Sequence, residues 1–373
     1  MTTVTSAVDA SGAREFVNAH VVADADSWDR DGRIPEAVLG AVSAAGMWAP
    51  FLPPDHGGAG ASWLTFGQIH EEFGRGCSSL RSLLTVHSMV AWTVMRWGSP
   101  AQQSEWLPRL ARGEALGAVC MTEPQAGSDT GGFTASATRA EDGWRLSGVK
   151  TWITGAQRAD VFLVYARNQH GLAAYLVPRN SPGLTVEPIQ DALGTRASLL
   201  GTVRLDGVTV AADALVGPES FLSGMVLTGM LDIGRLSVAA GSLGIVQGCL
   251  DACTAYTTSR TIAGTQLRDL QLIRAKVSNM VVDATAARLL VAQAAKLKDA
   301  GSPETIMATW IAKYFASVAA AEHAREAVQI HGAHGMGAQF PVARFYRDAK
   351  VMEIIEGSSE LQQLTIAASA YQR

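Results

Sequence analysis

The character of the sequence changes twice along the chain, and these changes constrain the fold more than any single motif. From about residue 11 to 113 apolar residues recur at helical spacing, as in IPEAVLGAVSAAGMW. At Gly117 short segments rich in Val, Thr, Tyr and Trp begin, separated by turns such as Asp142-Gly143. From about Phe221 helical spacing returns in longer segments. The pattern predicts an α+β multidomain chain, with a helical domain at 1–115, an antiparallel β-domain at 116–220 and a helical bundle at 221–373.

The last third has the features of long, closely packed helices. Gly241 and Gly244 lie among Ala and Leu residues, which indicates close helix contacts, because a glycine costs a helix about 1 kcal/mol. One helix is expected from about 269 to 300. Another is expected from about 303 to 331, with Ser302 capping its N-terminus.

Composition excludes several classes of protein. With 48% hydrophobic and 17% charged residues, the chain should be globular, and its 373 residues exceed what one core usually serves. A net charge of -4 without a Lys/Arg-rich run argues against nucleic-acid binding. We find no signal peptide and no uninterrupted apolar stretch of about 18 residues, so no membrane association is expected. Four cysteines without CxxC pairing indicate reduced thiols and a cytoplasmic protein.

Two glycine-rich segments resemble ligand motifs only superficially. The segment AGSLGIVQG lies inside a helical pattern without the preceding strand that a dinucleotide loop needs, so helix packing explains it better. His331 and His334, in QIHGAHGMG, lack the Cys or carboxylate partners of a metal site, so we predict no metal. A glycine-rich turn at a helix end, whose backbone N–H groups would suit a phosphate, is the better interpretation.

Two further segments could bind a ligand or be ordinary structure. MTEPQAGSDT follows the first predicted strand and is either a polar loop capped by Ser128 or a binding loop. In KTWITGA, Trp152 and Thr154 are expected on one face of a strand. They could cover a flat aromatic ligand, or form a half-buried strand with an outward threonine.

Each of two charged residues near helix ends has two possible interpretations. Arg260 is expected to close a long helix, where most arginines are simply solvated. Glu356 follows Ile354-Ile355 and precedes a glycine, so it is either a solvated helix terminus or a buried base.

The order of the motifs along the chain resembles that of the acyl-CoA dehydrogenase family of flavoproteins. The matching segments are MTEPQAGSD, KTWIT, DIGRLSVAA, SRTIAG, QIHGAHG and YRDAKVMEIIEG, and the resemblance covers nearly the whole chain. It implies an N-terminal helical domain, a central β-domain and a C-terminal four-helix bundle. FAD would be held between them and across a subunit interface, which implies a homodimer or homotetramer.

The resemblance also assigns roles to individual residues. Glu356 matches the catalytic base of the family. The residues expected at the chain's own flavin site are Met121, Thr122, Ser128, Trp152, Thr154 and Ser358. The residues expected to bind the FAD diphosphate of the neighbouring subunit are Arg260, Gln329, Gly332 and Gly335.

The chemistry of that family answers the question that Glu356 raises. A hydrogen alpha to a thioester is a very weak acid, so the base must be desolvated, which raises its pKa, and the enolate must be stabilised. Ile354 and Ile355 are expected to help exclude water from it. By resemblance, the thioester carbonyl would accept bonds from the Glu356 backbone N–H and the FAD ribityl hydroxyl. Glu356 would take the alpha proton while a hydride passes from the beta carbon to the flavin.

Several positions depart from the family pattern. Ala263 replaces the usual aromatic of the RxxFG segment, Ala333 the second glycine of a GG pair, and Gly155 the common Asn after WIT. Ser358 and Glu360 stand where Thr and Gln are frequent. These changes concern the contacts to the FAD adenosine, and FAD itself is still expected.

A narrower resemblance concerns the substrate. CSSLRSLLTVHSMVAWTV and AKVMEIIEGSSE resemble the subgroup that acts on acyl groups tethered to an acyl carrier protein in polyketide and nonribosomal pathways. It includes the dehydrogenase that forms hydroxymalonyl-carrier protein on the way to methoxymalonyl extender units. The expected reaction is oxidation of a short hydroxyacyl group at C3. The alternatives are an acyl-CoA alpha,beta-dehydrogenase, a flavin monooxygenase or oxidase, and a non-catalytic carrier-binding protein. Electrons would pass to an electron-transfer flavoprotein or to oxygen.

Overall fold

The N-terminal part of the computed structural model, which describes residues 8–219 and 223–371, is helical. The expected domain boundary at 220–221 lies outside the described residues. The helices are α1 (Ala10–His20), α2 (Ala25–Asp31), α3 (Glu36–Ala44), α4 (Trp63–Gly76), α5 (Ser78–Trp97) and α6 (Pro100–Ala111). The starts of α1 and α6 follow capping rules: the Asp9 side chain accepts from the Gly12 amide, and Ser99 forms a capping box with Gln102.

A mixed eight-stranded sheet forms the central part. Its strands are β1 (Gly117–Cys120), β2 (Ser136–Ala140), β3 (Gly143–Ile153), β4 (Val161–Asn168), β5 (Gly171–Pro178), β6 (Leu184–Pro188), β7 (Gly201–Ala211) and β8 (Leu215–Val216). The order is β6-β7-β3-β2-β4-β5-β8, with β1 beside β4. Most pairs are antiparallel as expected, but β4 runs parallel to β1 and, at one residue pair, to β2. The parallel pairing arises because β1 enters the sheet directly from the helical domain, so no hairpin joins it to its neighbour.

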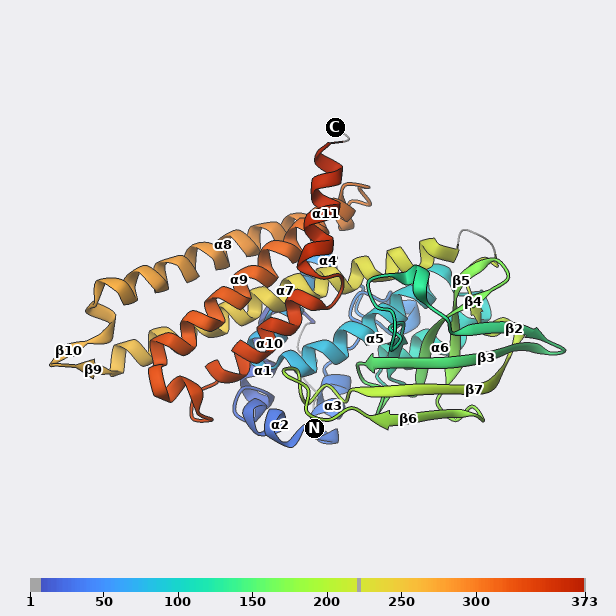
Figure 1. Ribbon diagram of the computed structural model, residues 1–373, viewed down its shortest axis with the longest axis horizontal. Helices are drawn as coiled ribbons and strands as arrows, with labels where there is room; N and C mark the ends of the chain where they lie inside the picture. The colour runs from blue at the N-terminus through green and yellow to red at the C-terminus, as the bar shows by residue number, and fades with distance from the viewer. Residues whose placement is uncertain (1–7, 220–222, 372–373) are drawn as a thin grey trace.

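The C-terminal part is a bundle of long helices. Its elements are α7 (Ser223–Ser259), the hairpin β9 (Thr261–Ile262) and β10 (Thr265–Gln266), α8 (Gln271–Asp299), α9 (Thr305–His331), α10 (Val342–Ile354) and α11 (Ser359–Ala370). Helices α7 to α10 pack against one another, and α11 projects beside α9 (Figure 1). Helix α9 begins at Thr305, not at 303, because Ser302 bonds the Glu304 amide within a turn that precedes the helix.

Helix α7 is long and connects the β-domain with the far end of the bundle. It runs from the β-domain at the right of Figure 1 to the β9–β10 hairpin at the left. Its glycines make room for neighbours, as expected: a Cβ on Gly244 would lie 2.6 Å from the Arg75 backbone nitrogen of α4. Residues 224–259 are long and apolar enough to cross a membrane, but 78% of their most apolar window is buried inside the protein. Its apolar character is therefore explained by its place in the core.

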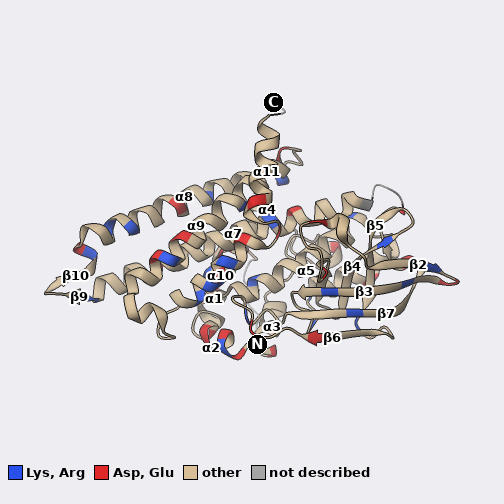
Figure 2. Ribbon diagram, in the orientation of Figure 1, with Lys and Arg blue, Asp and Glu red and all other residues tan. Residues whose placement is uncertain are grey.

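Charged residues are distributed along all three parts. Figure 2 shows basic and acidic residues interspersed over the described helices and strands. The charges that bear on function are instead the few that lie buried beside α7.

Candidate active site

Glu356 lies in a tight turn between α10 and α11. Helix α10 ends at Ile354, and Glu356 and Gly357 both have positive φ angles, of 57° and 96°. A non-glycine residue in this region is strained and is often found at functional sites. The turn directs the Glu356 side chain onto Gly234 of α7, where a Cβ would overlap Cδ and Oε2 of the carboxyl group. Gly234 therefore provides the space that the carboxyl group occupies.

The Glu356 carboxyl group is desolvated. Its Oε2 is buried and has no hydrogen-bond partner among the described residues. Burial raises the pKa of Glu356 to about 7, although Arg235, Lys313 and Arg81 oppose the rise as nearby cations. The acid is therefore not a solvated helix terminus.

Side chains from α7 and α9 hold the backbone of the Glu356 turn. Arg235 donates from Nε to the Glu356 carbonyl at 3.2 Å, and its guanidinium lies 4.0 Å from the centre of the Trp310 ring. Lys313 donates to the Gly357 carbonyl at 2.7 Å. The DIGRLSVAA motif contains Gly234 and Arg235 without revealing their roles, and no sequence pattern singled out Lys313.

The two isoleucines before Glu356 differ in their surroundings. Ile355 is partly buried and packs against the main core, as expected. Ile354 is 59% exposed, so the expectation that it helps to exclude water from the base is wrong. It occupies the last position of α10.

Trp152 and Thr154 lie at the end of β3, but not on one face of a regular strand. The register of β3 against β7 shifts between Lys150 and Ile153, and Trp152 has a φ of 58°. Strand β3 ends at Ile153, so Thr154 belongs to the following turn. The bulge leaves the Trp152 indole 57% exposed. An exposed ring held by strained backbone fits a flat aromatic ligand.

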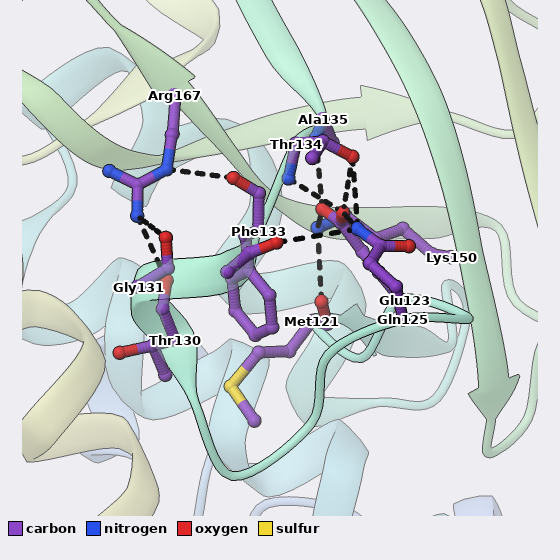
Figure 3. Close-up of polar contacts among 11 residues, drawn as sticks. Met121, Glu123, Gln125, Thr130, Gly131, Phe133, Thr134, Ala135, Lys150 and Arg167 are labelled. Carbon is purple, nitrogen blue, oxygen red and sulfur yellow. Dashed lines mark hydrogen bonds and ion pairs between the residues drawn. The ribbon is translucent and has the colours of Figure 1, made fainter.

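A buried ion pair fixes the loop that follows β1 (Figure 3). Lys150 Nζ lies 2.7 Å from Glu123 Oε1 and also donates to the Met121 carbonyl at 3.0 Å. Glu123 accepts from the amides of Thr134 and Ala135 at the far end of the loop. Burial would raise the pKa of Glu123, but these donors hold it at about 2. Sequence analysis missed this pair.

The same arrangement brings two of the predicted flavin contacts, Met121 and Thr122, close to two others, Trp152 and Thr154. The Thr151 amide bonds the Thr122 carbonyl at 2.9 Å, which brings Met121 and Thr122 beside the Trp152 bulge. Ser128 is exposed in the loop after β1. Ser358 caps α11, where its side chain accepts from the Leu361 amide.

The second predicted group lies elsewhere in the chain. Arg260 follows the C-terminal end of α7, and Gln329 lies in the last turn of α9. Gly332 and Gly335 belong to the short 3₁₀ helix Gly332–Met336 that follows. All four are at the end of the bundle remote from the β-domain (Figure 1). From Gly234 to the end of α7 is roughly 38 Å at 1.5 Å per residue, so one chain does not bring the two groups together.

The histidines of the glycine turn have structural partners. His331 stacks on Tyr256 with ring centres 4.2 Å apart, and its Nδ1 bonds the Ala327 carbonyl. His334 lies within hydrogen-bond distance of the Tyr256 hydroxyl. Ala263 and Gly264 form the turn of the nearby hairpin with positive φ angles of 48° and 81°.

A desolvated carboxyl group, an exposed indole at the end of a strand, and a helical, β and helical architecture together fit an acyl-thioester dehydrogenase that uses a flavin. Comparison with known proteins agrees. The family models for the N-terminal, middle and C-terminal domains of acyl-CoA dehydrogenase match residues 10–114, 118–208 and 224–371. The chain belongs to the acyl-CoA dehydrogenase family, whose members are FAD-dependent oxidoreductases.

Three similar proteins illustrate the relationship. Glutaryl-CoA dehydrogenase of Desulfococcus multivorans is 36% identical over 364 residues, covering 95% of this chain and 93% of that protein. The structure of a glutaryl-CoA dehydrogenase with glutaryl-CoA superposes with a TM-score of 0.94 and 34% identity, over 100% of this chain and 96% of the other. FkbI, described as serving biosynthesis of the methoxymalonyl extender unit of the polyketide FK520, has a TM-score of 0.88 and 32% identity. The match covers 98% of this chain and 99% of FkbI.

Proposed function

We propose that Glu356 is the catalytic base of this dehydrogenase. The observation that carries the proposal is the buried, unpartnered Oε2 of its carboxyl group, whose pKa burial raises to about 7. A base works best when its pKa is near the working pH, because it is then both available and strong enough. Bound FAD would supply the acceptor for the substrate's hydride.

The residues that would hold FAD belong to two chains. Trp152 and Thr154, with the loop at Met121 and Thr122, would support the flavin ring. Arg260 and the glycine turn, at the remote end of the bundle, would bind the diphosphate of a neighbouring subunit's FAD. Exposed apolar residues along α8, such as Leu272 and Leu289, support a subunit interface on the bundle. A homodimer or homotetramer follows from this proposal.

We propose that the substrate is a short acyl thioester with oxygen at its far end, oxidised at C3 while tethered to an acyl carrier protein. Arg81 of α5 supports a polar acyl group. Its side chain is fully buried, lies in the field of Glu356, and bonds only Ser82, Thr85 and the Met352 thioether. No carboxylate lies within ion-pair distance of it among the described residues. Asp348 and Glu356 act on Arg81 without forming an ion pair with it, so a plain hydrocarbon chain would add no polar partner, whereas a hydroxyl or carboxylate would bind this cation.

The likeness to FkbI favours the carrier-linked substrate, and the likeness to glutaryl-CoA dehydrogenase favours a CoA ester with a carboxylated acyl group. We therefore retain acyl-CoA oxidation as the second candidate. In both cases an electron-transfer flavoprotein is the candidate electron acceptor. We expect a cytoplasmic location, since the four cysteines are buried free thiols.

The test compares anaerobic bleaching of the flavin absorbance by one three-carbon hydroxyacyl group on a carrier protein and on CoA. Faster bleaching with the carrier substrate supports the carrier-linked function. Equal or faster bleaching with CoA supports the second candidate. A glutaryl or butyryl ester of CoA distinguishes a carboxylated from a plain acyl group.

A further inference from the structure

In the turn that carries Glu356, the carbonyl group of Gly357 accepts hydrogen bonds from two side chains, although one would satisfy it. The Gly357 carbonyl accepts from Lys313 Nζ at 2.7 Å and also from Gln362 Nε2 at 3.0 Å. Gln362 is a neutral donor on the adjoining helix α11, so the carbonyl would be satisfied without an ammonium group. The presence of a buried cation at this place therefore needs a separate reason.

Burial of the Lys313 side chain costs free energy. Its side chain is fully buried in the middle of α9, and no carboxylate lies within ion-pair distance of it among the described residues. A buried charge costs several kcal/mol unless an opposite charge compensates it. The opposite charge with the largest influence on Lys313 is the carboxylate of Glu356, ahead of Glu353 and Glu360.

We propose that Lys313 is a positioning residue for Glu356: it fixes the strained turn through the Gly357 carbonyl and, through its charge, favours the ionised carboxylate. The inference rests on the proposed role of Glu356 as the base. Fixing the turn matters because positive φ angles at both Glu356 and Gly357 are stable only where the surroundings impose them.

The other charges around Glu356 limit what Lys313 alone can do. Arg235 approaches from α7 and Arg81 from α5, and both also favour the ionised carboxylate. Glu353 on α10 and Glu360 on α11 raise the pKa of Lys313 and so keep it charged, whereas Arg235 lowers that pKa. Of the three cations, only Lys313 can lose its proton near neutral pH, because arginine stays charged.

Lys313 should therefore lower the pH at which Glu356 becomes ionised. Burial lowers the pKa of Lys313 to about 8, and burial raises that of Glu356 to about 7. The form with Glu356 ionised and Lys313 charged is most populated between the two values. The two groups interact, so the midpoints observed will belong to the pair.

The decisive variant is Lys313→Arg in the FAD-loaded protein. It retains a positive charge and hydrogen-bond donors, so the acid midpoint of flavin bleaching should stay in place. An acid midpoint that moves as far in Lys313→Arg as in Lys313→Met would overturn the proposal. Lys313→Met removes the charge and should raise the pKa of Glu356, which lowers the rate of flavin bleaching about tenfold at acid pH.

Two further measurements distinguish the electrostatic role of Lys313 from a purely structural role. They also distinguish a failure of this proposal from a failure of the proposed role of Glu356 as base. Gln362→Met removes a neutral donor from the same carbonyl, so it should slow bleaching without moving the acid midpoint. The carboxylic-acid infrared band that is lost in Glu356→Gln reports the protonation of Glu356 without substrate. An unmoved band titration in Lys313→Met would refute the electrostatic role. Full activity of Glu356→Gln would refute the base instead.

Discussion

Replacing Gly234 by alanine should disable the base while leaving the fold intact. Gly234 lies in α7, where its missing side chain makes room for the Glu356 carboxyl group. An added Cβ would lie 2.9 Å from Oε1 and even closer to Oε2 and Cδ. Because Arg235 and Lys313 hold the backbone of the turn, the carboxyl group has to swing away by rotation of its own side chain.

The expected loss of rate follows from the overlap between the added Cβ and the Glu356 carboxyl group. Carbon and oxygen atoms pack without strain at about 3.5 Å, so the carboxyl group must move by about 1 Å. A displacement of about 1 Å at a reacting group costs on the order of 100-fold in rate. The loss should appear in the rate of flavin bleaching, because substrate binding does not depend on the position of the base.

Rapid-mixing measurement of anaerobic flavin bleaching tests this prediction, with flavin content and thermal unfolding measured in parallel. The matched control is Gly224→Ala in the same helix, where a Cβ meets no atom within 4 Å. The control should bleach at the wild-type rate and be slightly more stable, since alanine favours helix. A wild-type rate in Gly234→Ala would refute the placement of Glu356 against α7.

Three other predictions concern charge and assembly. Since burial raises the pKa of Glu356 to about 7 and a base must be ionised to act, the bleaching rate should rise with pH through a midpoint near 7; a midpoint near 4.5 would indicate a solvated acid. Lys150→Met leaves Glu123 uncompensated in the core and should lower the free energy of unfolding by about 3–5 kcal/mol in urea denaturation, and a loss below about 1 kcal/mol would contradict a structural role. Arg260→Ala should reduce flavin content and subunit association together, as measured by absorbance and gel filtration; unchanged values would place Arg260 outside the cofactor site.

The sequence predicted the parts of the fold that depend on local patterns. Helical spacing located α7 to α9 within a few residues, and the glycines of α7 indicated helix contacts that the structure contains at Gly244. The pairing of β1 with β4 was missed, because it depends on which strands meet in space and not on alternation within a strand.

The site was predicted less completely than the fold. The motif around Glu356 indicated the residue that we propose as the base, but the positive φ angles at Glu356 and Trp152 have no local sequence cause and are imposed by tertiary contacts. Lys313 and Arg81 approach the base from 43 and 275 positions away, counted from their numbers in the sequence. Charges so far apart in the chain meet only in the folded protein.

The most direct test of the account is anaerobic flavin bleaching by Glu356→Gln, with hydroxyacyl-carrier, hydroxyacyl-CoA and butyryl-CoA as substrates. Glutamine fills the same space beside Gly234 but cannot accept a proton. The account predicts a yellow protein with wild-type flavin content whose absorbance does not bleach with any substrate that bleaches the wild type. Bleaching at the wild-type rate would show that Glu356 is not the base.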